Sequence, residues 1–173
     1  MLYIFTGDGK GKTTAALGQA LRSVGDGKKV LMIQFIKGPW PSGEDESFKR
    51  LAPDFELRKR GKGFVGILGD ALPREEHERA AAAALAELVN ETQSGKWDIV
   101  IADEINNAID LNLISEDEAL ALARLGQAKN VDIIFTGRGA RQKLIDAADL
   151  VSNIMDVKHP FYEGKKARHG IEY

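Results

Sequence analysis

The residues best suited to chemistry lie near the start of the chain, in a glycine-rich segment with two lysines and three threonines. This segment, Thr6–Thr14, follows the apolar run Leu2–Phe5 and precedes a helix-like stretch over Ala15–Leu21. A strand, a glycine-rich turn, Gly-Lys-Thr and a helix form the context that a phosphate-binding P-loop needs. Backbone N–H groups of such a loop point at an anion, Lys12 adds a positive charge, and the Thr13 hydroxyl reaches a magnesium ion. The sequence therefore predicts a site for the phosphates of a nucleotide.

The spacing of this loop departs from the common pattern G-x-x-x-x-G-K-[ST]. That pattern requires glycine at the place of Thr6, whereas the first glycine here is Gly7. A glycine-rich turn before a helix can also be a simple chain reversal without a ligand. Because the strand, the Gly-Lys-Thr-Thr run and the helix are all present, we predict a variant phosphate-binding loop.

Composition favours an ordinary globular enzyme. The chain has 173 residues, 43% hydrophobic and 29% charged, so we expect residues 1–173 to form a single domain. A net charge of −2 gives no general basic bias for binding nucleic acid. The sequence has no cysteine, which excludes disulfides and thiolate metal sites. It has no apolar run of membrane-spanning length and no signal-peptide pattern, so we expect a cytoplasmic protein that does not contact a membrane.

Apolar runs alternate with helix-like segments along the chain. The runs typical of strands are residues 2–5, 30–36, 55–58, 97–102, 131–135 and 150–155. The segments typical of helices are residues 12–24, 44–51, 73–94, 115–128 and 141–148. This alternation predicts an α/β, P-loop NTPase-like fold, with a mostly parallel twisted sheet of about five to six strands and helices on both faces. Residues 158–173 are polar and predict an irregular C-terminal tail.

Acidic residues follow one of these strands. In parallel sheets ligands bind at the carboxyl ends of the strands, so the loops after Phe5, Ile36, Arg58, Ala102 and Phe135 should share one rim. Asp103 and Glu104 stand at such an end and resemble a Walker B element that holds Mg²⁺ opposite the P-loop. Such acids can instead cap the following helix, and Glu104 can serve either the metal or a hydrolytic water.

Further candidates lie on the same rim. Arg138 follows a strand and should face the phosphates, although it can also be an exposed loop arginine. The basic cluster Arg58–Arg60 with Lys62 is either a solvated face or a contact for an anionic substrate. Phe64, flanked by glycine and valine in a loop over residues 60–70, is either a core residue or the wall of a pocket for a flat apolar ligand.

The histidines and tryptophans give weaker signals. We expect His77 to be exposed on its helix, and His159 and His169 in the tail form no metal motif. Trp97 is expected in the core, whereas Trp40, between two prolines, is ambiguous.

Several motifs together resemble the P-loop type of ATP:corrinoid adenosyltransferase. The matches span nearly the whole chain, and they are residues 7–18, 27–30, 34–38, 63–64, 103–104, 136–139, 157–161 and 170–173. The resemblance implies transfer of the 5′-deoxyadenosyl group of ATP to the cobalt(I) of a reduced corrinoid, with release of triphosphate. It also implies ATP bound in the reverse of the usual direction, Mg²⁺ or Mn²⁺, a homodimer, and a flavoprotein as one candidate reductant.

Site residues follow from the resemblance, position by position. Lys12 and Phe64 would be catalytic, with Phe64 helping to remove the lower ligand of the corrinoid. Thr13 and Glu104 would hold the metal. The nucleotide contacts would be Gly7, Asp8, Gly9, Lys10, Gly11, Lys12 and Thr13, with Thr14, Arg22 and Arg138 as weaker candidates.

The sequence departs from the family at two places. Related members carry tryptophan two residues after the phenylalanine, where this chain has Gly66, and asparagine is common where this chain has Asp8. We expect the Asp8 side chain to point away from the phosphates or to meet Lys10 or the metal. The alternative function is a P-loop ATPase that acts on a protein or nucleic-acid partner. A small-molecule kinase would need a general base that the sequence does not offer.

Overall fold

A parallel β-sheet carries the loops of the predicted site. The computed structural model describes residues 1–66 and 70–171. Within that part of the chain, six parallel strands pair in the order β3-β2-β4-β5-β1-β6. They are β1 (Leu2–Thr6), β2 (Val30–Gln34), β3 (Phe55–Lys59), β4 (Ile99–Asp103), β5 (Asp132–Thr136) and β6 (Leu150–Asn153). Strand β5 separates β1, which leads into the P-loop, from β4, which ends in the acidic residues.

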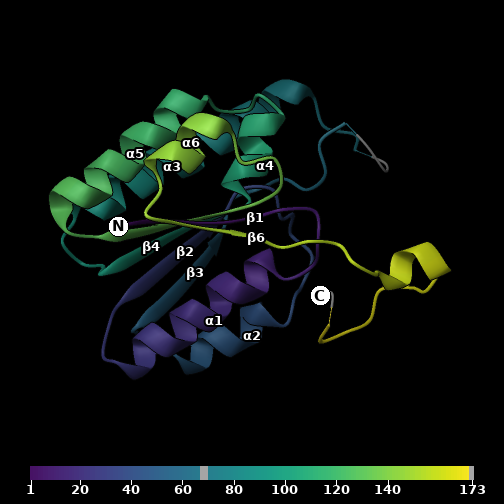
Figure 1. Cartoon of the computed structure of the whole chain (residues 1–173), viewed down its shortest axis with the longest axis horizontal. Helices are drawn as coiled ribbons and strands as arrows, with labels where there is room; N and C mark the ends of the chain where they lie inside the picture. The colour runs from purple at the N-terminus through teal and green to yellow at the C-terminus, as the bar shows by residue number, and fades with distance from the viewer. Residues whose placement is uncertain (67–69, 172–173) are drawn as a thin grey trace.

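Helices cover both faces of the sheet, as predicted. The helices are α1 (Lys12–Gly25), α2 (Glu44–Ser47), α3 (Arg74–Gln93), α4 (Ile105–Asp110), α5 (Glu116–Lys129) and α6 (Gln142–Ala147). Two 3-10 helices are η1 (Phe48–Arg50) and η2 (Pro160–Glu163). Helices α1 and α2 lie on one side of the sheet and α3 to α6 on the other (Figure 1). The fold is therefore a three-layer α/β architecture of the P-loop NTPase-like class.

Successive side chains along each strand point to opposite faces of the sheet, so the hydrophobic core consists of two halves, one on each face. Along β2, Leu31 and Ile33 pack in the half with α3 to α6, whereas Val30 and Met32 pack in the half with α1. Every residue of β2 and β4 is buried, as near-continuous apolar runs in a central parallel sheet require. This double packing fixes the carboxyl ends of β2 and β4 next to the P-loop.

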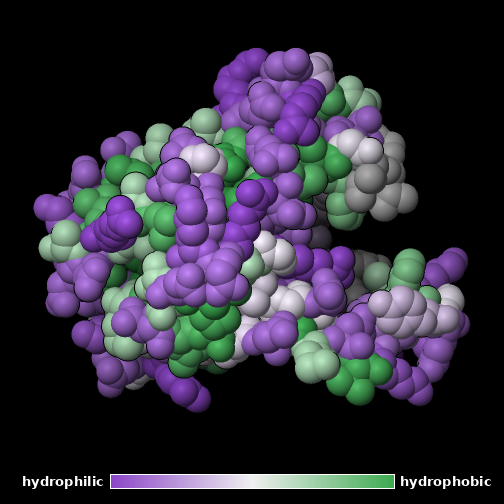
Figure 2. Space-filling model, turned by 45° about the horizontal axis from the view of Figure 1, so that its top comes forward, coloured by the Kyte–Doolittle hydropathy of each residue, from purple (hydrophilic) through white to green (hydrophobic). Residues whose placement is uncertain are grey.

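The chain differs from the sequence expectations in two helical segments. Helix α4 was not predicted; it starts directly after Glu104, so the acidic pair belongs to a very short strand-to-helix turn. The tail predicted as irregular contains η2. Figure 2 shows the segment around η2 as a lobe beside the main body. The predicted loop over residues 60–70 and the family match at residues 170–173 each include residues that lie outside the described part of the chain, namely 67–69 and 172–173.

No helix in the described ranges combines the length and the apolar character that crossing a membrane requires.

Candidate active site

The P-loop owes its unusual glycine spacing to the neighbouring edge strand. The chain after β6 passes directly over the loop, and the Gly9 N–H donates to the Ile154 carbonyl at 2.8 Å. A Cβ atom on Gly7 would overlap the Asn153 side-chain oxygen and the Ile154 carbonyl oxygen. Gly7 also has φ +101°, a conformation that favours glycine. Thr6, in contrast, is the last residue of β1, so glycine is needed at position 7 rather than position 6.

Lys12 and Arg138 concentrate positive charge at this loop. The Lys12 ammonium donates to the Gly9 carbonyl at 2.7 Å, and burial lowers its pKa, with the Arg138 charge lowering it further. The Arg138 guanidinium donates to the Asp8 carbonyl at 3.3 Å, while its backbone N–H donates to Asn107 at 3.0 Å. Two cations held this close repel each other, so the site favours an anion between them.

Asp103 is the centre of a buried hydrogen-bond network. Its carboxylate accepts from the hydroxyls of Thr13 at 2.9 Å and Thr136 at 2.6 Å, and from the Gln34 amide at 3.0 Å. Burial raises the pKa of Asp103, and these hydrogen bonds oppose that effect. The network joins α1, β2, β4 and β5, so the Thr13 hydroxyl is fixed in place before any ligand binds.

Glu104 has an unusual position next to this network. Its φ of 63° lies in the left-handed region, a conformation that costs a non-glycine residue about 1 kcal/mol or more. Its N–H donates to Thr136 at 2.8 Å. Burial and the neighbouring Asp103 charge raise the pKa of Glu104 to about 7. Its Oε2 atom is buried and has no hydrogen-bond partner among the described residues, so this oxygen is available to a ligand.

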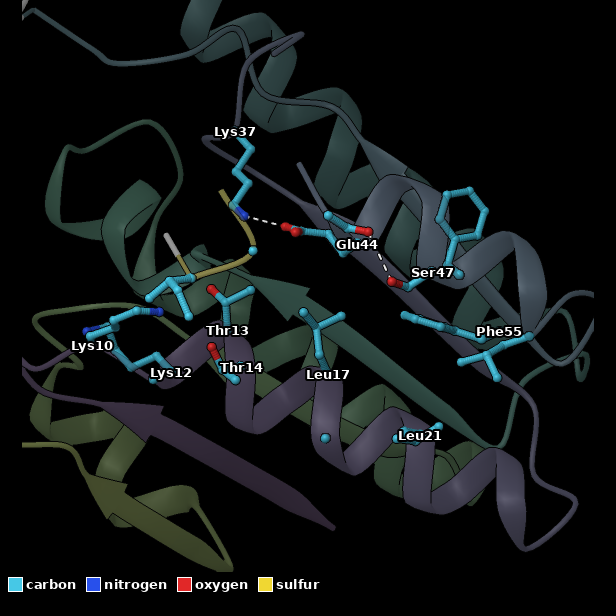
Figure 3. Close-up of a pocket in the computed structure, with 17 residues that line it drawn as sticks. Lys10, Lys12, Thr13, Thr14, Leu17, Leu21, Lys37, Glu44, Ser47 and Phe55 are labelled. Atoms are coloured by element: carbon cyan, nitrogen blue, oxygen red, sulfur yellow. Dashed lines mark hydrogen bonds and ion pairs between the residues drawn. The ribbon is translucent and has the colours of Figure 1, made fainter. Parts of the chain in front are cut away.

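A second lysine faces the P-loop from the loop after β2. Lys37 forms an ion pair with Glu44 at the start of α2, and Figure 3 shows this pair directed toward the side of the pocket that holds Thr13. Burial alone would raise the pKa of Glu44, but the Lys37 ammonium outweighs burial and holds it at about 2. The charges of Asp103 and Glu104 also contribute to the raised pKa of Lys37. Lys37 and Glu44 were not among the predicted site residues, although Lys37 follows a strand at the predicted rim.

The P-loop lies between two pockets. The first has a volume of about 860 Å³. Its polar half contains Lys10, Lys12, Thr14 and Lys37, whereas Leu17, Leu21 and Phe55 lie in its apolar half (Figure 3). Phe48 and Leu51 also line this pocket. The second pocket, of about 570 Å³, is lined by Phe64, Val65, Glu104 and Arg138. Lys12 and Thr13 line both pockets, so a group bound to the P-loop can reach either one.

Comparison with known proteins identifies the family. The family model described as ATP:corrinoid adenosyltransferase BtuR/CobO/CobP matches residues 1–173. The chain is 35% identical over 173 residues to the corrinoid adenosyltransferase of Escherichia coli (strain K12), which covers 100% of this chain and 85% of the relative. The same identity and coverage hold for the corrinoid adenosyltransferase CobA of Salmonella typhimurium. The chain belongs to the ATP:corrinoid adenosyltransferase family. It is therefore a transferase with ATP and a corrinoid as its substrates, and the alternative of a partner-driven ATPase is not favoured.

A solved structure supports the fold of this adenosyltransferase. The flagellar accessory protein FlaH from Methanocaldococcus jannaschii superposes with a TM-score of 0.54, covering 88% of this chain and 69% of that chain. Sequence identity is 13%, so the likeness shows the fold and nothing about the reaction.

Most of the residues predicted for the adenosyltransferase site come together on one rim. Lys10, Lys12, Thr13 and Thr14 line the first pocket, and Phe64, Glu104 and Arg138 line the second. The Asp8 side chain is exposed. Arg22 lies in the last turn of α1 and lines neither pocket. Of all the predicted contacts, Arg22 is the one that the fold does not bring to the rim.

The basic cluster has structural partners in this adenosyltransferase. Arg58 pairs with Glu56, Glu87 and Glu91 at 2.6–2.8 Å, and Arg60 pairs with Glu87. These ion pairs tie β3 and the loop that follows it to α3. Because the guanidinium groups of Arg58 and Arg60 already pair with these carboxylates, a structural role is favoured over contact with an anionic substrate.

The prediction that His77 is exposed was wrong. The His77 side chain is buried, and its Nε2 atom lies 3.1–3.2 Å from both carboxylate oxygens of Asp70. Asp70 also accepts the backbone N–H groups of Gly66 and Leu72. His77 therefore helps to hold the loop that carries Phe64 against α3. Trp97 is buried as expected, and its indole N–H donates to Glu91 at 2.7 Å.

Proposed function

We propose that this adenosyltransferase uses its P-loop to hold the triphosphate of ATP as a leaving group beside a corrinoid in the second pocket. In the transfer, the electron pair of cobalt(I) forms a bond to C5′ of the ribose. The C5′–O bond breaks, and its electron pair leaves with triphosphate. The observation that supports this arrangement is that Lys12 and Thr13 belong to both pockets.

The residues Gly7 to Thr13 would bind the triphosphate. Negative charge on the leaving group rises in the transition state, so backbone donors and Lys12 aimed at it lower the barrier. Arg138 would add a second cation, since it already lies over the loop at Asp8. Thr14 would contribute from the first turn of α1. Arg22 is left out of this set, because it lies in the last turn of α1 and lines neither pocket.

A divalent cation fits the donors at the end of β4. The buried Glu104 Oε2 atom, which has no partner among the described residues, and the Thr13 hydroxyl, which lines the same pocket, are hard oxygen donors of the kind that Mg²⁺ or Mn²⁺ prefers. In the described part of the chain, no three His, Asp or Glu side chains form a metal site alone, so oxygens of the triphosphate would complete the set. Thr13 and Glu104 would hold the ion, with Asp103 orienting the Thr13 hydroxyl. The ion would supply charge neutralisation at the phosphates.

Phe64 would contact the corrinoid. An axial ligand must leave the cobalt before it becomes a good nucleophile, and an apolar wall disfavours that polar ligand. Phe64 is 52% exposed and lines the second pocket, as a contact for an incoming apolar ligand requires. Attack by cobalt(I) removes no proton, so the reaction needs no general base in this pocket.

Wider properties of the enzyme remain proposals. We propose that residues 1–173 act as one domain, that two copies form a homodimer, and that the protein works in the cytoplasm. A flavoprotein is the proposed reductant of the corrinoid. The net charge of −2 supports small-molecule substrates over nucleic acid.

The proposed function is tested by mixing the protein anaerobically with ATP, Mg²⁺ and a chemically reduced cobalt(I) corrinoid. The expected result is a light-sensitive cobalt–carbon product whose absorbance spectrum appears only when all three are present. Partner-stimulated release of phosphate without that product would instead support the ATPase alternative.

A further inference from the structure

Two large aromatic side chains, Trp40 and Phe64, lie exposed and in contact, and Phe64 also lines the second pocket. Trp40, on the loop after β2, is 58% exposed, and Phe64, on the loop after β3, is 52% exposed. Their ring centroids are 5.9 Å apart, with a tilt of 34° between the rings. Rings of this size usually bury most of their surface, so a pair left in solvent suggests a contact surface.

The loop that carries Trp40 is held firmly in place. The Lys59 ammonium donates to the Trp40 carbonyl at 2.9 Å and to the Ser42 hydroxyl at 3.0 Å, and it pairs with Asp45 at 2.6 Å. The loop that carries Phe64 is tied to the loop after β2 by the Gly63 N–H, which donates to the Ile36 carbonyl at 3.0 Å. Both rings are therefore positioned by the ends of neighbouring strands.

Two glycines make room for the indole of Trp40. A Cβ atom on Gly38 would lie 2.5 Å from the indole, and a Cβ atom on Gly63 would lie 2.7 Å from it. Both distances are shorter than a van der Waals contact, so a side chain at either position would displace the indole from its place beside the two loops. Backbone covers one side of the indole, and the exposed side continues the surface of Phe64.

This aromatic pair is continuous with the reaction site. Phe64 lines the same pocket as Lys12, Thr13 and Glu104, so a ligand that contacts the pair from this pocket also lies beside the P-loop. The occupant that fits is wide, flat and largely apolar, and its reactive centre must reach the nucleotide. A corrin macrocycle has these properties, and it is the acceptor in the proposed reaction.

We propose that Trp40 is a corrinoid-contacting residue and that it provides the second aromatic ring of the corrinoid site. The inference rests on the proposed function and adds a residue from a different loop to it. Gly66, two residues after Phe64, has φ +69° and no side chain, whereas Trp40 places an indole beside Phe64 from another loop.

The inference is tested by steady-state kinetics with chemically reduced corrinoid. Trp40→Ala should raise the corrinoid KM about 10- to 100-fold, the effect of losing the burial of one aromatic side chain, and should leave the ATP KM unchanged. Trp40→Phe, which keeps an aromatic ring, should restore most of the affinity. Leu150→Ala serves as the control, because Leu150 is exposed at 43% on β6 and lines neither pocket.

A double-mutant cycle distinguishes loss of the contact between Trp40 and the corrinoid from a general disturbance of the protein structure. Gly38→Ala should displace the indole and raise the corrinoid KM in the wild-type background, yet add little in the Trp40→Ala background. Fluorescence gives a readout without turnover, since the chain has two tryptophans and Trp97 is buried. Titration with the oxidised corrinoid should quench the fluorescence of the exposed Trp40 in the wild-type protein. This quenching should be absent in the Trp40→Phe variant.

Two results would overturn the inference. The first is an unchanged corrinoid KM in Trp40→Ala. The second is a loss of rate that appears only when a flavoprotein supplies the electron, which would assign Trp40 to a protein partner. If the wild-type protein forms no cobalt–carbon product, the proposed function fails first, so the two failures are distinguishable.

Discussion

The two ends of the candidate site are built in opposite ways. At the phosphate end, formed by Gly7–Thr13 with Asp103 and Glu104, the buried Asp103 carboxylate accepts from Thr13 and Thr136, and the Lys12 ammonium donates to the Gly9 carbonyl. At the aromatic end, formed by Trp40 and Phe64, apolar rings lie in solvent on two loops. The phosphate end is ready for charge before the ligand arrives, whereas the aromatic end gains its stabilisation only when a ligand covers it.

This difference has a chemical reason. Stabilising a developing negative charge requires donors that need no reorganisation during the reaction, and the hydrogen-bond network around Asp103 meets that requirement. Binding a large apolar acceptor depends instead on removing apolar surface from water. Changes at the phosphate end should therefore affect kcat, and changes at the aromatic end should affect the corrinoid KM.

The largest effect should come from Lys12→Ala. Loss of a charge that contacts the leaving group should lower kcat by about 10²- to 10³-fold, because that contact strengthens in the transition state. Measurements of kcat and both KM values check this, with Lys28→Ala as a control at an exposed lysine that lines neither pocket. If Lys12→Ala changed only the corrinoid KM, the phosphate end would not act on kcat, and the difference between the two ends would be contradicted.

A smaller effect is expected from Glu104→Gln. If the carboxylate of Glu104 holds the cation, the Mg²⁺ concentration for half-maximal rate should rise about tenfold or more. Rates are measured across a Mg²⁺ titration. The control is Asp117→Asn, whose side chain is 80% exposed on α5. An unchanged Mg²⁺ dependence would remove Glu104 from the metal site.

At the aromatic end, Phe64→Ala should raise the corrinoid KM about tenfold and leave the ATP KM unchanged. Initial rates over a matrix of both substrates give the two constants. An equal rise in both KM values would mean that Phe64 supports the P-loop as well, and the comparison between the ends would no longer hold.

The remaining prediction concerns stability, not catalysis, and is made at the Lys37–Glu44 ion pair. The pKa of Glu44 is lowered to about 2 in the folded protein, so the pair stabilises the fold at neutral pH by on the order of 2 kcal/mol after allowance for solvent screening. Because the folded pKa is depressed, this contribution is present above about pH 4.5 and is lost as the pH falls toward 2. The difference in unfolding free energy between the wild type and Glu44→Gln should shrink over that range in urea titrations. A pH-independent difference would contradict the account.

Local sequence signals predicted the parts of the fold that depend on local physics. The P-loop, the strands and helices α1, α3 and α5 follow from glycine placement, apolar runs and the capping box at Ser115. Helix α4 was not predicted because it has only six residues and begins directly after Glu104, whose left-handed φ has no sequence signature. The prediction that His77 is exposed failed because its partner, Asp70, comes from a loop, and the helix pattern does not show that this loop packs against α3.

The site was predictable where residues belong to one motif or follow a strand of the parallel sheet, as Glu104 and Arg138 do. The Lys37–Glu44 pair depends on how the chain turns between β2 and α2, and the contact between Trp40 and Phe64 depends on how two loops meet across the ends of β2 and β3. Contacts between loops of neighbouring strands follow from the order of the strands in the sheet. The alternation of strands and helices along the sequence does not determine that order. Lys37 could have been identified from its place after a strand, but its partner could not.

In the proposed transfer, the triphosphate of ATP leaves intact while the adenosyl carbon forms a bond to cobalt. The most direct measurement is ³¹P NMR of the phosphorus products, made on an anaerobic reaction in which the cobalt–carbon product is quantified by absorbance. We expect the reaction to release one triphosphate for each cobalt–carbon bond formed. Formation of ADP and orthophosphate, without a matching amount of cobalt–carbon product, would contradict it.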